Sequence, residues 1–276
     1  MGRVTVRRPV LRVRSGELSQ RADTLVAEEP MEIRVGGGPL AVTMRTPGHD
    51  FDLALGFLVS EGVVQQAEDV VAVRYCAGAA ADGTNTYNVV EVVLDPAVPA
   101  PDASARRNFL TTSSCGLCGK ASLDAVRTSS RWRVADDPLQ VRADVLAALP
   151  DRLREAQHVF ESTGGLHAAG LFSADGELLT LREDVGRHNA VDKVLGDALR
   201  NGSLPLRGTV LMVSGRASFE LVQKAAMAGV PALAAVSAPS SLAAELAEEA
   251  GLLLVGFLRG SSMNVYAHPE RLATGR

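Results

Sequence analysis

The last third of the chain alternates short apolar runs with segments of helical periodicity, and this alternation limits the possible folds more than any other feature. The apolar runs predict strands at residues 209–213, 232–236 and 252–258, with helices between them at residues 219–228 and 242–250. Strands that are apolar throughout and are joined by helices form parallel sheets through right-handed crossovers. The aromatic content of only 4% is typical of such strands. The sequence therefore predicts an α/β fold with parallel strands in its C-terminal part.

The first third of the chain is β-rich. Two short apolar runs, at residues 31–35 and 40–45, surround Gly36-Gly37-Gly38 and predict a hairpin. Two more strands are expected at residues 70–75 and 87–94. We therefore expect a smaller β-rich part before the parallel sheet.

Three further helices are expected, at residues 51–61, 145–160 and 191–199. Asp50 is predicted to be the N-cap of the first, because apolar side chains follow it at helical spacing. Asp175-Gly176 is a strong turn signal between two apolar runs and predicts a second hairpin. The strands of this hairpin are expected at residues 166–172 and 177–181.

A proline-rich stretch separates the two parts of the chain. Pro96, Pro99 and Pro101 exclude a helix there and disfavour a central strand, so we interpret the stretch as a linker or domain edge. The segment that follows is rich in Ser, Thr, Gly and Arg, and it is predicted to be a mobile loop. The expected division is an N-terminal β-rich α/β subdomain (1–102), a cysteine loop (103–121) and a C-terminal α/β subdomain (122–276).

The net charge of −4 gives the chain no general attraction for nucleic acid. The longest apolar runs are too short to span a bilayer, so we expect a soluble cytoplasmic protein without a membrane anchor. The N-terminus is locally basic, and a frayed, solvated segment that runs into a first strand is favoured there over a docking arm or a targeting peptide. Its arginines are Arg3, Arg7, Arg8, Arg12, Arg14 and Arg21, against Glu17 as the one acid before Asp23.

Each of the three predicted parallel strands is followed by a small polar loop. Because the carboxyl ends of parallel strands lie at one edge of a sheet, we expect these loops to be close together. Ser hydroxyls, Gly amides, Arg side chains and the N-termini of the next helices suit a nucleotide or pyrophosphate. Neither a P-loop nor a G-x-G-x-x-G motif is present, which disfavours a generic NTPase or dehydrogenase. The loops are Ser214-Gly215-Arg216, Ser237-Ala238-Pro239-Ser240 and Arg259-Gly260-Ser261-Ser262.

A second polar cluster runs from Arg182 to Lys193, across a predicted transition from strand to helix. His188, Asn189 and Lys193 are its candidate ligand-binding residues. A solvated helix start with ion pairs explains the cluster equally well, because runs of charge usually mark exposed faces. Both interpretations stay open at this point. His167, which enters a strand upstream, is interpreted as a structural residue.

Cys115 and Cys118 form a C-x-x-C pair just before a predicted helix over residues 121–128. The helix N-terminus, with Lys120 and Arg107 nearby in sequence, would lower a thiol pKa and favour the nucleophilic thiolate. A thioredoxin-like dithiol exchanger would use the same spacing. A zinc site that includes Cys76 is disfavoured, because the sequence has no second ligand pair at suitable spacing. The H-x-E and P-C-x-x-C signature of zinc deaminases is also missing.

Four motifs together resemble the FdhD family, the accessory sulfurtransferases of formate dehydrogenase. The resemblance extends from about residue 28 to about residue 271 and so covers nearly the whole chain. The motifs are Ser114-Cys115-Gly116-Leu117-Cys118-Gly119, the polar cluster from Glu183 to Lys193, Ser214-Gly215-Arg216 and Gly256-Phe257-Leu258-Arg259-Gly260.

The resemblance implies a carrier that accepts persulfide sulfur from a cysteine desulfurase. The carrier would transfer this sulfur to molybdenum bis(molybdopterin guanine dinucleotide) before the cofactor enters formate dehydrogenase. A homodimer with a cytidine-deaminase-like core is implied, and a guanine nucleotide could mimic the cofactor. Cys115 matches the persulfide position and Cys118 its partner. The cofactor-binding segment would be Phe257, Leu258, Arg259, Gly260, Ser261 and Ser262. A dithiol oxidoreductase and a noncatalytic cofactor chaperone are the alternatives.

Overall fold

The computed structural model of the chain describes residues 4–76, 87–99, 101 and 130–273. The predicted cysteine loop, with Cys115 and Cys118, lies outside the described residues. The helix expected at residues 121–128 lies outside them as well.

A six-stranded mixed sheet forms the centre of the molecule, in the order β13-β12-β11-β10-β8-β9. β10 (Thr209–Val213), β11 (Ala232–Ala235) and β12 (Leu253–Arg259) are parallel neighbours, which confirms the predicted parallel strands. The strands outside this trio are antiparallel to their neighbours; hairpins connect β8 to β9 and β12 to β13, whereas a strand and a helix lie between β8 and β10 in the sequence. They are β8 (His167–Ser173), β9 (Leu178–Asp184) and β13 (Ser262–Ala267).

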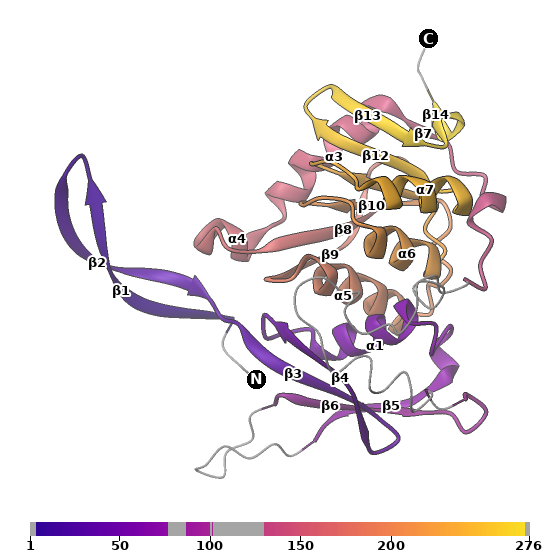
Figure 1. Cartoon of the computed structure of the whole chain (residues 1–276), viewed down its shortest axis with the longest axis horizontal. Coiled ribbons are helices and arrows are strands. Elements are labelled where there is room, and N and C mark those ends of the chain that lie inside the picture. Colours follow the sequence, from indigo (N-terminus) through magenta and orange to yellow (C-terminus); the bar gives the residue numbers. More distant parts are fainter. Residues whose placement is uncertain (1–3, 77–86, 100, 102–129, 274–276) are drawn as a thin grey trace.

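Helices cover both faces of this sheet (Figure 1). On one face, α3 (Ala143–Glu155) buries Leu146, Leu149 and Leu153 against the strands. The other face is covered by three helices whose apolar side chains belong to a second, larger cluster. These helices are α5 (Arg187–Arg200), α6 (Phe219–Met227) and α7 (Ser241–Ala250).

The N-terminal part is a four-stranded sheet in the order β4-β3-β6-β5, with one helix, α1 (Asp50–Ser60). The hairpin expected around Gly36-Gly37-Gly38 is present as β3 and β4. Met31 and Ile33 of β3 belong to the same buried cluster as Val194 and Leu195 of α5, so the two parts share one core. The strands are β3 (Glu29–Val35), β4 (Gly38–Arg45), β5 (Val70–Tyr75) and β6 (Val89–Leu94).

The contact between α1 and α5 is exceptionally close because each helix has a glycine at the crossing. A Cβ atom on Gly196 would lie 1.8 Å from the carbonyl oxygen of Asp52, and one on Gly56 would lie 1.7 Å from that of Asp192. Real Cβ atoms do not approach backbone atoms so closely, so the crossing requires both glycines.

Three local predictions are corrected by the structure. Asp50 is the first residue of α1 rather than its N-cap; the cap is His49, and the Asp50 carboxylate binds Arg45 instead. The helix expected over residues 145–160 is two helices, α3 and α4 (His158–Thr163), with a break at Ala156 and Gln157. α5 starts at Arg187, earlier than predicted, because the polar cluster itself forms its first turn.

From Thr5 onward the basic N-terminal segment forms a strand, as expected, and this strand is paired rather than frayed. β1 (Thr5–Arg14) and β2 (Glu17–Val26) pair along their whole length as an antiparallel hairpin with its turn at Ser15 and Gly16. This hairpin, called the N-terminal arm below, projects from one side of the body (Figure 1). A regular register of ten pairs thus replaces the solvated segment that the charge pattern had favoured.

Within the described ranges, none of the helices combines the length and the apolar character needed to cross a bilayer.

The remaining described elements are short. The short elements are the 3-10 turns Ala67–Asp69, Val134–Asp136 and Pro269–Arg271, and the paired strands β7 (Val141–Arg142) and β14 (Leu272–Ala273).

We predict that Gly196→Ala lowers the free energy of unfolding by about 2 kcal/mol or more, because the new methyl group must separate α1 from α5. Urea denaturation of the purified protein measures this change. Gly165→Ala is the matched control, since its Cβ would meet the Val26 side chain at 3.4 Å and the Thr163 carbonyl oxygen at 3.9 Å, both ordinary contact distances. Equal stability of the two variants would contradict the proposed role of the crossing.

Candidate functional site

The described residues contain the predicted ligand edge but not the predicted cysteine pair. Cys76, at the end of β5, is half-buried and free, and its amide donates to Val89 at 2.9 Å. Among the residues that the structure describes, no group of three or more His, Cys, Asp or Glu side chains could hold a metal ion. The site is therefore built from the carboxyl ends of the parallel strands.

The loops after β10 and β11 lie side by side, as predicted. Ala217 and Pro239 form an isolated parallel bridge, and the amide of Ser240 donates to the carbonyl of Ala217 at 3.0 Å. Ser240 also caps α7, because its side chain accepts from the amide of Ala243 at 3.2 Å. Each loop thus joins a strand end to a helix start, the arrangement that favours anion binding in α/β proteins.

The third loop differs from the prediction. β12 continues past the ends of its neighbours, so that the Phe257 amide donates to Ser237 at 3.2 Å. Arg259 then pairs with Ser262 across a tight turn into β13, with Gly260 at a φ of 52°. No helix follows this turn, so of the three loops only those after β10 and β11 lead into a helix.

The turn nevertheless exposes several of its residues. Phe257 has a φ of 51° at an irregular point of the β12–β13 register, and 41% of its surface is exposed. Leu258, next to it, is fully buried in the core under α3. Arg259, Gly260, Ser261 and Ser262 are exposed. The segment is thus held by Leu258 and presents an aromatic ring and a guanidinium on the surface.

Gly215 lies just past the end of β10, beside the side chains of His167 and Arg187. A Cβ at Gly215 would be 3.5 Å from Nδ1 of His167 and 3.8 Å from Cδ of Arg187. His167 reaches this edge because β8 is antiparallel to β10 and so begins where β10 ends. Ser214 joins the two strands, since its hydroxyl accepts from the Ala168 amide at 2.9 Å. Arg216, beyond Gly215, is exposed.

His188 lies in the same region and is neutral under ordinary conditions. Burial, together with the positive charges of Lys224 and Arg187, lowers the pKa of His188 to about 3. Its Nε2 atom lies 3.2 Å from the hydroxyl of Ser218. Glu220 is 3.8 Å away, but a neutral imidazole forms no ion pair with it. Burial, and after it the positive charge of the nearby Arg187, also lowers the pKa of His167.

Asn189 and Lys193 occupy a different environment from His188. Both are buried and both bind Asp184, Lys193 at 2.7 Å and Asn189 at 3.1 Å. Asn189 also donates to the carbonyl of Met44, near the end of β4, and Lys193 to that of Thr46, just after β4. We call Asp184, Asn189, Lys193 and residues 44–46 the Asp184 clamp. These bonds hold Asn189 and Lys193 in place between β4 and α5, and a ligand-binding role for the two residues stays a prediction.

A cavity of about 510 Å³ opens beside this edge, between the sheet and the α3–α4 helices. It is lined partly by His167, Ser214 and Val236, which belong to the strand ends. Apolar residues supply much of the remaining wall. The other lining residues are Pro150, Leu153, Arg154, Gln157, Phe160, Gly164, Gly165, Leu166 and Val185.

Two nitrogen donors near the cavity lack partners among the described residues. The Nε2 atom of Gln157, a residue only 5% exposed, has no acceptor, and neither does Nε of Arg187. A buried unsatisfied donor is costly, so its presence favours a bound acceptor such as a carbonyl or phosphate oxygen. Arg154, which stacks 4.0 Å over the Phe160 ring, adds a cation and an aromatic surface.

Sequence reasoning missed Arg154, Gln157 and Phe160. The sequence pattern predicted one continuous helix there, and the break that turns Gln157 inward has no marker such as glycine. Glu183 stabilises this break, because its carboxylate accepts from the amides of Val159 and Phe160 at 3.0 and 2.8 Å. The sequence indicated a polar cluster that includes Glu183, but it gave no sign that the Glu183 carboxylate binds the start of α4, because the tertiary fold brings the two together.

The chain is similar to known proteins over almost its entire length. A family model described as the FdhD/NarQ family matches residues 26–273, a span that begins where the N-terminal arm ends. A protein of Streptomyces avermitilis named sulfur carrier protein FdhD is 67% identical over 99% of this chain and 97% of its own length. Its namesake in Mycobacterium tuberculosis is 57% identical, over 99% of this chain and 100% of that protein.

One solved structure has a similar fold. It is the crystal structure of a candidate formate dehydrogenase accessory protein from Desulfotalea psychrophila. It covers 98% of this chain and 100% of its own chain with a TM-score of 0.75. The sequence identity is 22%, so this likeness concerns the mixed α/β fold alone.

We predict that His188 makes the protein less stable as the pH falls. Its pKa in the folded state, about 3, is below the ordinary 6.5, so the unfolded chain binds more protons between these values. Neutral His188 makes its full contribution to the free energy of unfolding above pH 6.5. This contribution is lost toward pH 3, at about 1 kcal/mol per pH unit. Urea unfolding across this range should show a shallower pH dependence for His188→Gln than for the native chain, and identical slopes would refute the assignment.

Proposed function

The chain belongs to the FdhD/NarQ family, and on that premise we propose that it is a sulfur carrier that serves formate dehydrogenase. The similarity to sulfur carrier proteins at 67% identity supports this proposal most directly. The sheet edge and its cavity supply a second, independent support, because a carrier must also bind the molecule that accepts its sulfur.

The sulfur itself would be carried by Cys115. In our proposal, the Cys115 thiolate attacks the outer sulfur of a persulfide on a cysteine desulfurase, which leaves the donor as a thiolate and Cys115 as a persulfide. Passing that outer sulfur to a metal as sulfide returns Cys115 to the thiolate and takes two electrons from the acceptor metal. Cys118 is then the neighbouring thiol that assists release. The first step needs no external oxidant or reductant, because the transferred sulfur has the same oxidation state in the donor persulfide and in the Cys115 persulfide.

The acceptor would be molybdenum bis(molybdopterin guanine dinucleotide), handled as cargo. Its phosphates match the positive potential at Gly215 and the exposed Arg216 and Arg259, and its flat ring systems match the aromatic surface of Phe257. Gln157, which lines the cavity, and Arg187, which lies beside Gly215, both have unpaired donors. We infer that the segment Phe257–Ser262 and the cavity together bind one nucleotide arm. A cytoplasmic homodimer with a cytidine-deaminase-like core is the setting that we propose for this exchange.

We predict that Cys115→Ala abolishes sulfur loading, because no other thiol stands at the persulfide position. Mass spectrometry after incubation with a desulfurase and cysteine should show an adduct of about 32 Da on the peptide that contains Cys115 in the native chain. Cys76→Ala is the matched control and should load normally, since Cys76 lies at the end of β5.

The same assay separates the alternatives. A carrier still loads when Cys118 is replaced by Ala, whereas a dithiol oxidoreductase loses its activity when either cysteine is replaced. A noncatalytic chaperone would bind nucleotide but show no adduct in any variant. Absence of the adduct from the native chain would overturn the proposal.

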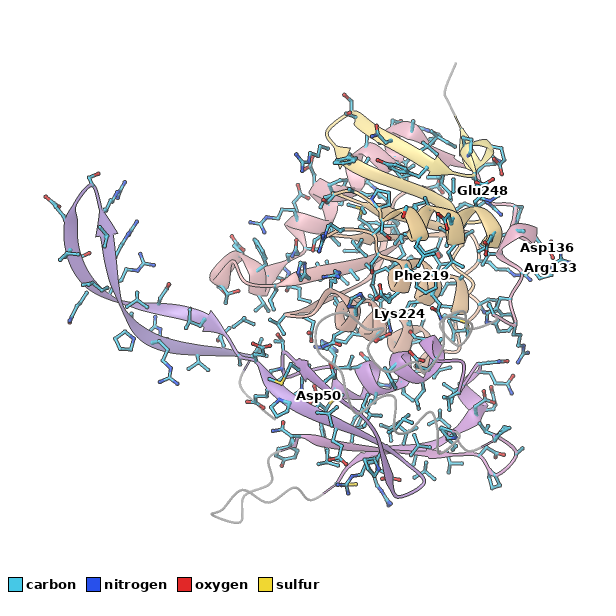
Figure 2. The ribbon with its side chains drawn as sticks, in the orientation of Figure 1. Asp50, Arg133, Asp136, Phe219, Lys224 and Glu248 are labelled. Carbon is cyan, nitrogen blue, oxygen red and sulfur yellow. The ribbon has the colours of Figure 1, made fainter. Side chains whose placement is uncertain are left out.

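We predict that the full chain binds GDP, used as a probe for the dinucleotide, and that Arg259→Ala weakens this binding about tenfold or more. The change removes a charge-assisted hydrogen bond to phosphate, for which about 1.5–3 kcal/mol is typical. Titration calorimetry measures both affinities. Arg133→Ala is the control, because Arg133 is exposed at the far edge of the body, beside Asp136 (Figure 2). No binding of GDP to the native chain, or equal weakening by both variants, would contradict the site.

A further inference from the structure

The wall of the cavity between the sheet and the α3–α4 helices carries little charge. Of the twelve described residues that line it, only Arg154 has a permanently charged side chain, and Arg154 is exposed and stacks over Phe160. His167 also lines the cavity, but burial lowers its pKa, which keeps the imidazole neutral at neutral pH. A phosphate would lose its water there without gaining a counter-charge, which is costly. The cavity therefore suits the uncharged, flat part of a ligand better than its phosphates.

Gln157 places an unused hydrogen-bond donor in this wall. The residue is only 5% exposed, and its Nε2 atom has no acceptor among the described residues. Its backbone is satisfied, because the amide donates to Arg154 at 3.2 Å and the carbonyl accepts from Glu161 at 3.1 Å. A buried donor without an acceptor destabilises the folded chain, so it is best explained by a ligand that supplies the acceptor.

The position of Gln157 is fixed by the start of α4. Gln157 is the N-cap residue of this helix. The Glu183 carboxylate accepts from the amides of Val159 and Phe160, at 3.0 and 2.8 Å. A carboxylate of the chain itself therefore occupies the helix N-terminus, and the side chain of Gln157 is the group left for a ligand. α4 lies where β8 begins (Figure 1), so this side chain is held beside the ligand edge.

The cavity and the more strongly charged part of the edge meet at Gly215. A Cβ atom there would be 3.5 Å from Nδ1 of His167, which lines the cavity, and 3.8 Å from Cδ of Arg187. The Nε atom of Arg187 is also buried without an acceptor among the described residues. A guanidinium suits a phosphate, whereas the uncharged amide of Gln157 suits a carbonyl. A ligand with a ring and phosphates thus finds a donor for each part near one glycine.

A ring carbonyl is the acceptor that fits Gln157 best. A carboxamide has a donor and an acceptor side by side. The edge of a guanine ring presents the complementary pair, a carbonyl next to a ring N–H, and the edge of a pterin ring presents the same pair. Adenine presents an amino group at the position of the carbonyl. Because Nε2 is the unpaired atom of Gln157, adenine would place a donor against a donor.

We propose that Gln157 is a specificity-determining residue of the site, and that its Nε2 atom donates to the carbonyl of a guanine-like ring held in the cavity. This inference rests on the proposed function, since the ring belongs to the same cargo. The phosphates lie outside the cavity, beside Arg187 and the arginines of the edge loops. Gln157 selects the ligand and takes no part in sulfur transfer at Cys115.

Titration calorimetry of the full chain with GDP, IDP and ADP tests this inference. The native chain should bind GDP and IDP about tenfold or more tightly than ADP, because both keep the ring carbonyl and the N–H beside it. Gln157→Met keeps the length of the side chain but removes the amide. It should weaken GDP and IDP about tenfold and leave ADP unchanged. Gln140→Met is the matched control, because Gln140 is exposed, donates to the Glu270 carbonyl and does not line the cavity.

Urea unfolding of the ligand-free chain separates recognition from a structural role. Gln157→Met removes a buried donor that has no acceptor, so this variant should unfold at a higher urea concentration than the native chain. A glutamine that merely supports the fold would give a lower midpoint when it is replaced.

A competition experiment distinguishes the two rings that share the carbonyl edge. If 6-hydroxymethylpterin displaces GDP from the native chain but not from Gln157→Met, the site also accepts the pterin. If it displaces GDP from neither, the site is restricted to the nucleobase, and both results agree with recognition of the ring carbonyl by Gln157.

Three results would overturn the inference and leave the carrier function intact. They are ADP binding as tight as GDP binding in the native chain, equal losses of GDP and ADP affinity in Gln157→Met, and a lower urea midpoint of that variant. No binding of GDP to the native chain would overturn both this inference and the proposed ligand site. Sulfur loading of Cys115 is measured separately, so a failure of the carrier function itself is recognised by the missing adduct.

Discussion

The buried carboxylate of Asp184 is the group on which the geometry of the candidate site depends. It accepts hydrogen bonds from the amides of Thr46 and Gly186 and binds Lys193, so it joins the N-terminal sheet to the first turn of α5. Removing one partner of such a pair leaves an uncompensated buried charge, which typically costs about 3–5 kcal/mol. The same turn carries Arg187 and His188 to the end of β10. A structural ion pair therefore positions the positive charge of Arg187 and the neutral imidazole of His188 there.

The mixed character of the sheet shapes this site as much as its parallel centre does. Parallel strands bring the loops after β10 and β11 to one edge. An antiparallel neighbour contributes from its opposite end, which is why His167, at the start of β8, reaches the same edge. The hairpin after β12 then supplies Phe257 and Arg259 without a helix. The edge thus combines helix N-termini, strand starts and a turn, which suits a ligand with both phosphates and flat rings.

Charge is distributed unevenly in a chain whose net charge is small. The positive charge of the arm and the negative charge of the body largely cancel in the net charge of the chain. The arm projects from the body, however, so the two charges are separated in space (Figure 1). The buried cations behave differently: Lys224 on α6 is in the middle of the body (Figure 2) and binds Asp192 at 2.7 Å. Buried charges are paired within the chain, whereas the charges of the arm are available to other molecules.

The sequence by itself determined the local elements and the chemistry they carry. The periodicity of apolar residues predicted most strands and helices. The residues that follow the predicted parallel strands, Gly215 and Arg259 among them, indicated the ligand edge, and the motifs with the cysteine pair indicated the family. Only the tertiary structure decided that β8 and β13 are antiparallel, that Gln157 faces a cavity with an unpaired donor, that Asn189 and Lys193 belong to a clamp, and that the arginine-rich start is a paired ribbon. Local propensity depends on a few neighbours along the chain, whereas strand direction, burial and hydrogen-bond partners depend on surfaces that are far apart in sequence.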